Sequence, residues 1–316
     1  MIVTLTANPS LDRTVVLADP LQVGQVQVAR AAREDAGGKG INVSRVVAAS
    51  AVPTRAVLPL ADDDPFAVAL QTTALPSSLV PVAGHARANV TITDPAGVTT
   101  KINLPGAELT AADAAAVTAA VVSACADARW LVLAGSLPPG VADDFYVDVI
   151  DAVRSRWGSG APRIAVDTSG PALRAVVERA RPDLIKPNEH ELAELAGVTL
   201  DPAVDLVSSV ATIARGLVPT RVGAALVTLG GAGAVLITPD AVWAGTPPTI
   251  RVQSTVGAGD SSLAGYLIAD VSAAEPHERL RSAIRYGAAA ATLPGTQAPT
   301  PLDLPTGDVP VRALET

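Results

Sequence analysis

The sequence of 316 residues is poor in cysteine, in aromatic side chains and in basic charge. Its single cysteine, Cys125, excludes an intramolecular disulfide and is typical of proteins from a reducing compartment. Aromatic residues make up 3% of the chain, which disfavours a platform for stacking nucleic-acid bases. The formal net charge of −8 leaves no broad basic surface for phosphates of a nucleic acid, so we expect no such partner.

Long hydrophobic runs are missing too, although 49% of the residues are hydrophobic. No uninterrupted apolar stretch approaches the length that spans a membrane. The segment Met1–Ala7 is uncharged and ends at Asn8-Pro9, which is typical of a first strand rather than of a signal peptide. We therefore expect a cytoplasmic protein with no membrane partner.

The chain has a regular rhythm from about residue 110 onward. Apolar runs at 130–134, 164–166, 184–185 and 225–228 predict buried strands, and the segments between them predict helices. Such alternation predicts an α/β fold with a mostly parallel central sheet flanked by helices. In sheets of this kind, ligands bind at the carboxyl ends of the strands.

The N-terminal third differs from this rhythm. Its segments 13–33 and 88–103 alternate polar and apolar residues, as strands with one solvated face do, and a turn at 94–97 predicts a hairpin. We predict a single domain, residues 1–316, from which these two segments form a small β-sheet lid over the site.

The most informative motif is Thr255-Val256-Gly257-Ala258-Gly259-Asp260, which precedes an apolar helical pattern. Backbone N–H groups at such a helix start form an anion-binding cradle. A carboxylate beside a bound phosphate is electrostatically unfavourable unless it has a task, and Asp260 could serve as a general base. The alternative is that the glycines form a tight turn and Asp260 caps the helix.

A second glycine-rich loop, Gly37-Gly38-Lys39-Gly40-Ile41-Asn42, also precedes a helical pattern. It is not a Walker P-loop, because Arg33 stands where that motif needs glycine and Gly40 where it needs serine or threonine. Its lysine, asparagine and open backbone suit a phosphorylated, hydroxyl-rich ligand.

Other polar side chains have two interpretations each. Asp12 could accept hydrogen bonds from sugar hydroxyls or cap a turn. Arg87 and Lys101 could bind a substrate phosphate or be solvated lid residues. Asn188 and Glu191, three residues apart, could support water-mediated Mg²⁺ binding or form an N-terminal capping box.

Taken together, these motifs resemble those of the ribokinase-like (PfkB-type) carbohydrate kinases over essentially the whole chain. The segments 37–44 and 255–260 are the most specific, and Asn8–Asp12, Arg87–Val90, Thr100–Asn103, Gly135–Gly140 and Asp167–Gly170 also match. Within the family, they look most like those of enzymes that phosphorylate the 6-hydroxyl of fructose 1-phosphate with ATP.

The resemblance implies a role for each matching position. Asp260 would be the general base, and Gly257, Ala258 and Gly259 would hold the transferred phosphoryl group. The residues implied to bind the sugar phosphate are Asp12, Gly38, Lys39, Asn42, Arg87, Lys101 and Ser136. Those implied to bind ATP are Lys186, Asn188, Thr228, Gly230, Gly231 and Ala288, with adenine near a loop before Ala288. Asn188 and Glu191 would bind Mg²⁺ through water, and a homodimer could form through the lid.

Two alternatives to fructose 1-phosphate phosphorylation stay open. One is a kinase of the same family acting on tagatose 6-phosphate or fructose 6-phosphate, and the other is a sugar-phosphate sensor without catalysis. Glutamines at 25 and 27, where many relatives carry a basic residue, and the acidic run Asp62-Asp63-Asp64 depart from the family pattern and leave the preferred sugar open.

Overall fold

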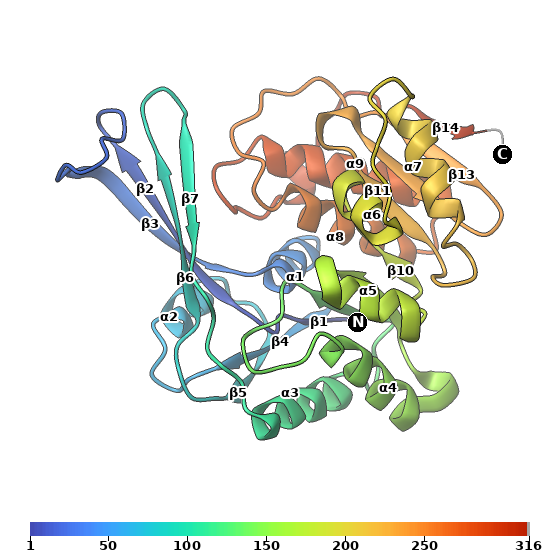
Figure 1. Ribbon diagram of the computed structural model, residues 1–316, viewed down its shortest axis with the longest axis horizontal. Coiled ribbons are helices and arrows are strands. Elements are labelled where there is room, and N and C mark those ends of the chain that lie inside the picture. Colours follow the sequence, from blue (N-terminus) through green and yellow to red (C-terminus); the bar gives the residue numbers. More distant parts are fainter. Residues whose placement is uncertain (315–316) are drawn as a thin grey trace.

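Mostly apolar strands of two to seven residues build the larger of two β-sheets in the computed structural model, which describes residues 1–314 (Figure 1). This ten-stranded sheet has the order β14-β13-β12-β11-β10-β9-β8-β1-β4-β5. Its strands are β1 (Ile2–Leu5), β4 (Thr54–Leu60), β5 (Ser77–Pro81), β8 (Trp130–Ala134), β9 (Arg163–Asp167), β10 (Leu184–Ile185), β11 (Ala225–Thr228), β12 (Ala234–Ile237), β13 (Val242–Gly245) and β14 (Val311–Leu314). In this order, neighbouring strands from β11 to β5 are parallel. The pairs β11–β12, β12–β13 and β13–β14 are antiparallel.

Helices cover both faces of this sheet. They are α1 (Lys39–Ala49), α2 (Phe66–Gln71), α3 (Ala111–Ala124), α4 (Phe145–Trp157), α5 (Gly170–Arg179), α6 (Glu189–Ala196), α7 (Leu206–Arg215), α8 (Ala258–Val271) and α9 (Pro276–Ala291). Alternate residues of a strand enter different cores, because successive side chains point to opposite faces. Val3 packs in the core under α3 to α7, and Ile2 packs in the core under α1, α8 and α9.

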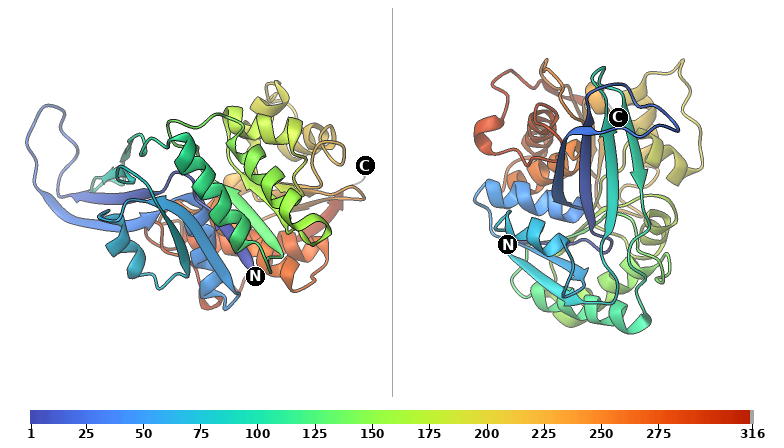
Figure 2. Two further views of the ribbon diagram at one scale, coloured as in Figure 1. Left: turned by 90° about the horizontal axis from the view of Figure 1, so that it is seen from below. Right: turned by 90° about the vertical axis from the view of Figure 1, so that its left-hand side faces the viewer.

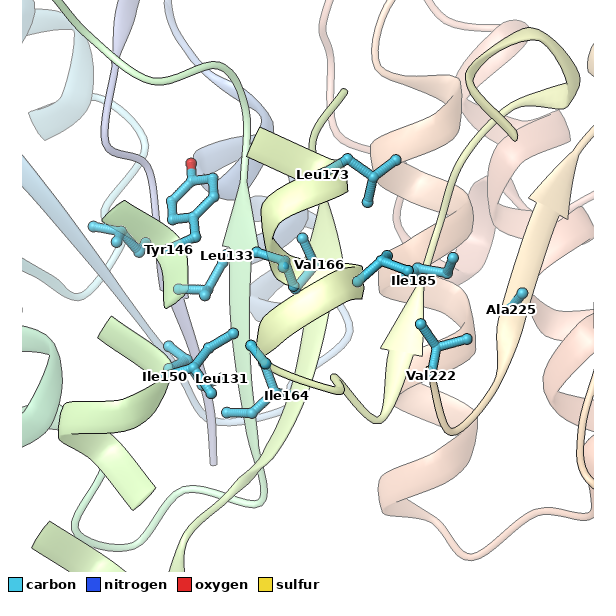
Figure 3. Packing of buried hydrophobic residues seen from close by; sticks show 14 of the residues in the cluster. Leu131, Leu133, Tyr146, Ile150, Ile164, Val166, Leu173, Ile185, Val222 and Ala225 are labelled. Atoms are coloured by element: carbon cyan, nitrogen blue, oxygen red, sulfur yellow. The ribbon is translucent and has the colours of Figure 1, made fainter. Parts of the chain in front are cut away.

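The first of these cores is continuous across the parallel strands. Leu131 and Leu133 of β8, Ile164 and Val166 of β9, and Ile185 of β10 lie side by side beneath α4 and α5 (Figure 3). Burial on both faces explains why these strands are apolar runs without alternation. The α/β fold with a mostly parallel, helix-flanked sheet is confirmed.

A separate four-stranded sheet, which we call the lid, projects from one side of the molecule (Figures 1 and 2). Its strands are β3 (Ala29–Gly37), β2 (Ser10–Leu17), β6 (Arg87–Thr93) and β7 (Thr99–Asn103), in that order across the sheet. The register pairs Asp12 with Asn89 and with Asp35. The side chains on the same face of the sheet as Asp12, Asn89 and Asp35 form the inner face of the lid, which adjoins the site.

Several elements differ from the sequence-based expectation. Residues 23–28, predicted as part of a strand, form an exposed loop in which Val26 is 99% exposed, because no neighbouring strand pairs with them. Helix α2 and strand β5, which the sequence did not predict, lie between β4 and the lid. Strand β14, which the sequence did not predict either, pairs with β13 at the edge of the sheet.

Among residues 1–314, no helix combines the length and the apolar character needed to cross a bilayer.

Candidate active site

The predicted site residues gather where the parallel strands end. Lys39 begins α1, Ser136 follows β8, Lys186 follows β10, and Asp260 lies in the first turn of α8. Asp12 and Arg87 belong to the lid strands that adjoin this edge. Segments more than 200 residues apart in sequence therefore meet at one place, as the rule for parallel sheets predicts.

Asp260 is buried and held from one side. It is 7% exposed, and its Oδ2 accepts a hydrogen bond of 2.8 Å from Nδ2 of Asn42 on α1. Burial raises the pKa of Asp260 to about 6, and the negative charge of Asp167 acts in the same direction. A carboxylate with such a pKa is ionised at neutral pH and still a useful proton acceptor.

The residues before Asp260 form the expected cradle, Gly257, Ala258 and Gly259, at the start of α8. Gly257 has a φ of 76°, a left-handed conformation that suits glycine, and it is the residue from which the helix begins. A Cβ on Gly259 would lie 3.2 Å from Nζ of Lys186. Helix N–H groups and a buried ammonium group thus converge on one spot, which favours an anion.

Two lysines share one buried carboxylate beside the cradle. Nζ of Lys39 lies 2.8 Å from Oδ1 of Asp167, and Nζ of Lys186 lies 3.1 Å from its Oδ2. Burial alone would raise the pKa of Asp167, but the charges of Lys186 and Lys39 outweigh it and hold that pKa below its ordinary value. Asp167 belongs to the segment Asp167–Gly170 that resembles the family motifs, but the sequence predicts no role for it. Its position at the carboxyl end of β9 was the signal that could have found it.

The inner face of the lid contributes a second polar group. Oδ1 of Asp12 accepts hydrogen bonds from Oγ of Ser10 (2.8 Å) and Nδ2 of Asn89 (3.0 Å). Burial raises the pKa of Asp12 and lowers that of Arg87 on the adjacent strand. Asn89 is a further polar residue of this site that the sequence-based prediction left without a role.

Five buried polar atoms around this site have no hydrogen-bond partner among the described residues. They are Oγ1 of Thr6, Oδ1 of Asn42, Nε of Arg87, Oδ1 of Asn89 and Oδ2 of Asp167, the last of which forms an ion pair with Lys186. Buried donors and acceptors without partners are costly and rare in folded proteins. Both kinds occur here, which fits a ligand that accepts and donates hydrogen bonds, as a sugar phosphate does.

Two residues predicted to bind the sugar phosphate, Lys101 and Ser136, lie farther from Asp12 and its partners. Lys101 is exposed and pairs with Thr91 across the lid, one step beyond the pair Asn89–Asn103. Oγ of Ser136 accepts a hydrogen bond of 3.4 Å from Nδ2 of Asn8, a residue of the turn between β1 and the lid strand β2. The structure therefore brings Lys101 to the correct face of the lid but not into contact with Asp12.

The predicted nucleotide residues lie along the next strands of the sheet. Thr228 ends β11 and forms a bridge to Asn188. Gly230 and Gly231 form a short turn, and a Cβ on either would meet no atom within 4 Å. Open backbone next to a strand end leaves room for a ligand to approach closely.

The prediction of a loop before Ala288 is wrong. The loop expected before Ala288 does not exist, because residues 276–291 form the continuous helix α9. Ala288 is buried, and its neighbour Gly287 packs against α8, where a Cβ would lie 2.3 Å from Oγ of Ser262. Close packing of α9 on α8 thus explains the alanines and glycine of this segment.

The residues proposed for Mg²⁺ form a capping box at the start of α6. Oδ1 of Asn188 accepts from N–H of Glu191 (2.8 Å), and Oε2 of Glu191 accepts from N–H of Asn188 (2.9 Å). The two interpretations of this motif are compatible, because Oε1 of Glu191 remains outside the box. No group of three acidic, histidine or cysteine side chains able to hold a metal occurs in the described part of the chain. These residues thus fit an ion held by water and substrate phosphates, not by a protein cage.

A groove of about 980 Å³ between α3 and α4 contains none of the predicted site residues and is lined mainly by alanine and other small side chains. The chemistry-bearing side chains lie instead at the strand ends beneath the lid.

Comparison with known proteins identifies similar chains. The family model described as pfkB family carbohydrate kinase matches residues 5–303. A protein of Rhodobacter capsulatus named 1-phosphofructokinase is 34% identical over 304 residues, which cover 95% of this chain and 93% of the relative. A 1-phosphofructokinase of Vibrio cholerae is 31% identical over 93% of this chain and 90% of its own length.

A solved structure is similar over nearly the whole chain. The phosphofructokinase-2 from Escherichia coli in complex with potassium superposes with a TM-score of 0.86 at 28% identity, covering 96% of each chain.

Proposed function

The chain belongs to the pfkB family of carbohydrate kinases, and we propose that it transfers the γ-phosphoryl group of ATP to the 6-hydroxyl of fructose 1-phosphate. The observation that carries this proposal is the buried Asp260 carboxylate at the start of α8, between Asn42 and the lysines on Asp167. Relatives that cover nearly the whole chain and bear the name 1-phosphofructokinase support the choice of sugar.

We assign the proton transfer to Asp260. As the 6-hydroxyl oxygen bonds to the γ-phosphorus, the bond from that phosphorus to the bridging oxygen of ADP breaks, and the hydroxyl proton passes to the Asp260 carboxylate. Asn42 holds that carboxylate in place through its 2.8 Å hydrogen bond. Charge that develops on the moving phosphoryl group is stabilised by the cradle N–H groups and by Lys186.

The acceptor sugar phosphate would lie under the lid. Asp12 and Asn89 offer hydrogen bonds to its hydroxyls, and the unpartnered Nε of Arg87 is available to its phosphate. Positioning of the hydroxyl against Asp260 is itself a large part of catalysis in phosphoryl transfer.

ATP would lie along the strand ends from Lys186 to the turn at Gly230. Asn188 and Glu191 would support a Mg²⁺ ion through water, and the ion would supply positive charge to the nucleotide phosphates. The sensor alternative is disfavoured because a protein that only binds phosphates gains nothing from a carboxylate buried beside the cradle.

The test is the release of ADP with Mg²⁺ and ATP on four acceptors: fructose 1-phosphate, fructose 6-phosphate, tagatose 6-phosphate and fructose. We expect the highest kcat/KM on fructose 1-phosphate. A preference for one of the 6-phosphates would move the enzyme to the alternative activity and keep the mechanism. No turnover on any acceptor would contradict the proposed function.

A further inference from the structure

A cluster of four ionisable side chains lies at the centre of the site, and the mechanism above gives no role to its buried member Asp167. The charge cluster consists of Lys39 of α1, Asp167 of β9, Lys186 after β10 and Asp260 of α8. Asp167 is fully buried and cannot reach a substrate directly, yet both of its carboxylate oxygens are engaged by lysines.

We propose that Asp167 is a positioning residue of the reaction, which holds Lys39 and Lys186 beside the glycine cradle and thereby sets the charge around Asp260. The inference rests on the proposed function and deepens it, because it assigns to the same site the group that organises its positive charge.

The geometry of the two lysines supports this role. Lysine has a long, flexible side chain, and an ammonium group without a fixed partner samples many positions. Here the two ammonium groups come from different elements and end on the two oxygens of one carboxylate, at 2.8 and 3.1 Å. Each ammonium has three N–H donors, so each can hold Asp167 and still donate to a phosphate oxygen.

The position of Lys186 makes this arrangement relevant to the transferred group. Lys186 is 5% exposed, and its Nζ lies next to the point where a side chain on Gly259 would begin. An anion bound by the cradle would therefore touch an ammonium whose place is fixed by Asp167. Lys39 begins the helix that carries Asn42, so Asp167 links the first glycine-rich loop to Lys186, which lies beside the second.

The charges that face Asp260 come from every element packed around it. The negative charge of Asp167 raises the pKa of Asp260, whereas Lys39 and Lys186 lower it. Glu191 of α6 acts on Lys39, and the buried Tyr146 hydroxyl of α4 lies close enough to Asp167 for that charge to act on it. Removing Asp167 and removing Lys39 should consequently move the pKa of Asp260 in opposite directions.

A purely structural ion pair would behave differently. The chain offers a matched comparison in Asp270, at the other end of the same helix α8. Asp270 is equally buried, pairs with Arg163 and Arg279, and accepts a hydrogen bond of 2.8 Å from Trp130 Nε1. Its loss should lower the melting temperature and leave the chemistry of the site unchanged.

The experiment measures the pKa of the Asp260 carboxyl by ¹³C NMR in the full-length protein labelled with [¹³C]aspartate, with Asp260→Asn to assign the signal. We expect Asp167→Asn to lower this pKa, Lys39→Met to raise it, and Asp270→Asn to leave it unchanged. We also expect Asp167→Asn to lower kcat by roughly 10²-fold, as for a misplaced catalytic site.

An unchanged pKa of Asp260 in Asp167→Asn would overturn the proposal, because neither the charge of Asp167 nor the lysines that it holds would then act on Asp260. So would an Asp167→Asn variant that, like Asp270→Asn, loses only thermal stability. If Asp167→Asn does not fold, Lys39→Met and Lys186→Met replace it: a raised pKa in both supports the proposal, and an unchanged pKa in both overturns it.

The NMR titration needs no turnover, so it separates the two proposals. A wild-type protein that phosphorylates no sugar phosphate would contradict the proposed function, whereas the opposite pKa shifts would still measure how Asp167 and Lys39 set the charge around Asp260.

Discussion

At the scale of single residues, the proposed activity depends on which side chains meet beneath the lid. Arg87 is half-buried, and its Nε has no partner among the described residues. We expect Arg87→Ala to raise KM for the sugar phosphate roughly 10- to 100-fold, the range for losing a charged hydrogen bond, with a far smaller effect on KM for ATP. Arg13→Ala is the control, because Arg13 pairs with Glu34 on the opposite face of the lid. Equal effects of Arg87→Ala on both substrates would contradict its assignment to the sugar phosphate.

The pKa of Asp260 sets a second expectation at this scale. A base works in its deprotonated form, and burial raises the pKa of Asp260 to about 6. The kcat/KM for the sugar phosphate should therefore fall below about pH 6, approaching a tenfold loss for each further pH unit. Initial rates measured between pH 5 and 9 in buffers of constant ionic strength would check this. If the residual activity of Asp260→Asn falls at low pH in the same way as that of the wild type, the titrating group is not Asp260.

At the scale of elements, the start of α8 combines backbone geometry with chemistry. Gly257 has a φ of 76°, so Gly257→Ala should cost about 1 kcal/mol of stability through backbone strain. Gly97, in the lid hairpin, has a φ of 83° and open space around it, so Gly97→Ala should cost a similar amount. Only Gly257→Ala should also lower kcat, because it alone disturbs the cradle. Thermal melting and initial rates of both variants decide this, and equal kcat values would exclude a role for the cradle.

The elements also show how far the sequence could predict the structure. Strands buried on both faces, such as β8, were predictable because they are apolar runs with clear ends. Residues 23–28 contain three valines and suggested a strand, but a strand needs a partner, and pairing is not visible in local sequence. For the same reason β14 was missed, since its partner β13 lies about 70 residues earlier.

Some residues of the site were predictable from the sequence, but the contacts between them were not. Glycine-rich loops before helices identified the cradle and Asp260. No local pattern indicated that Asn42 would donate to Asp260, or that Lys39 and Lys186, nearly 150 residues apart, would share Asp167. Such contacts depend on how the strands are ordered in the sheet, which local patterns do not specify.

At the scale of the whole molecule, the outer face of the lid is the surface that suits a second copy of the chain. The lid register places Val15, Val90, Ile92 and Ile102 on this outer face, opposite to the face that bears Asp12. Such an apolar patch on an edge sheet marks an interaction surface. We expect a homodimer in sedimentation velocity and a monomer for Ile92→Asp. Thr99→Asp, on the inner face, should remain dimeric, and a monomeric wild-type protein would contradict this assembly.

The most direct test of the account is the turnover of Asp260→Asn with ATP and fructose 1-phosphate, beside the wild type and Asp270→Asn. We predict that kcat of Asp260→Asn falls roughly 10²- to 10⁴-fold while its affinity for ATP stays nearly unchanged. Asp270→Asn, altered at the far end of the same helix, should keep its kcat. Near-full turnover of Asp260→Asn would show that this carboxylate is not the base and would contradict the central claim.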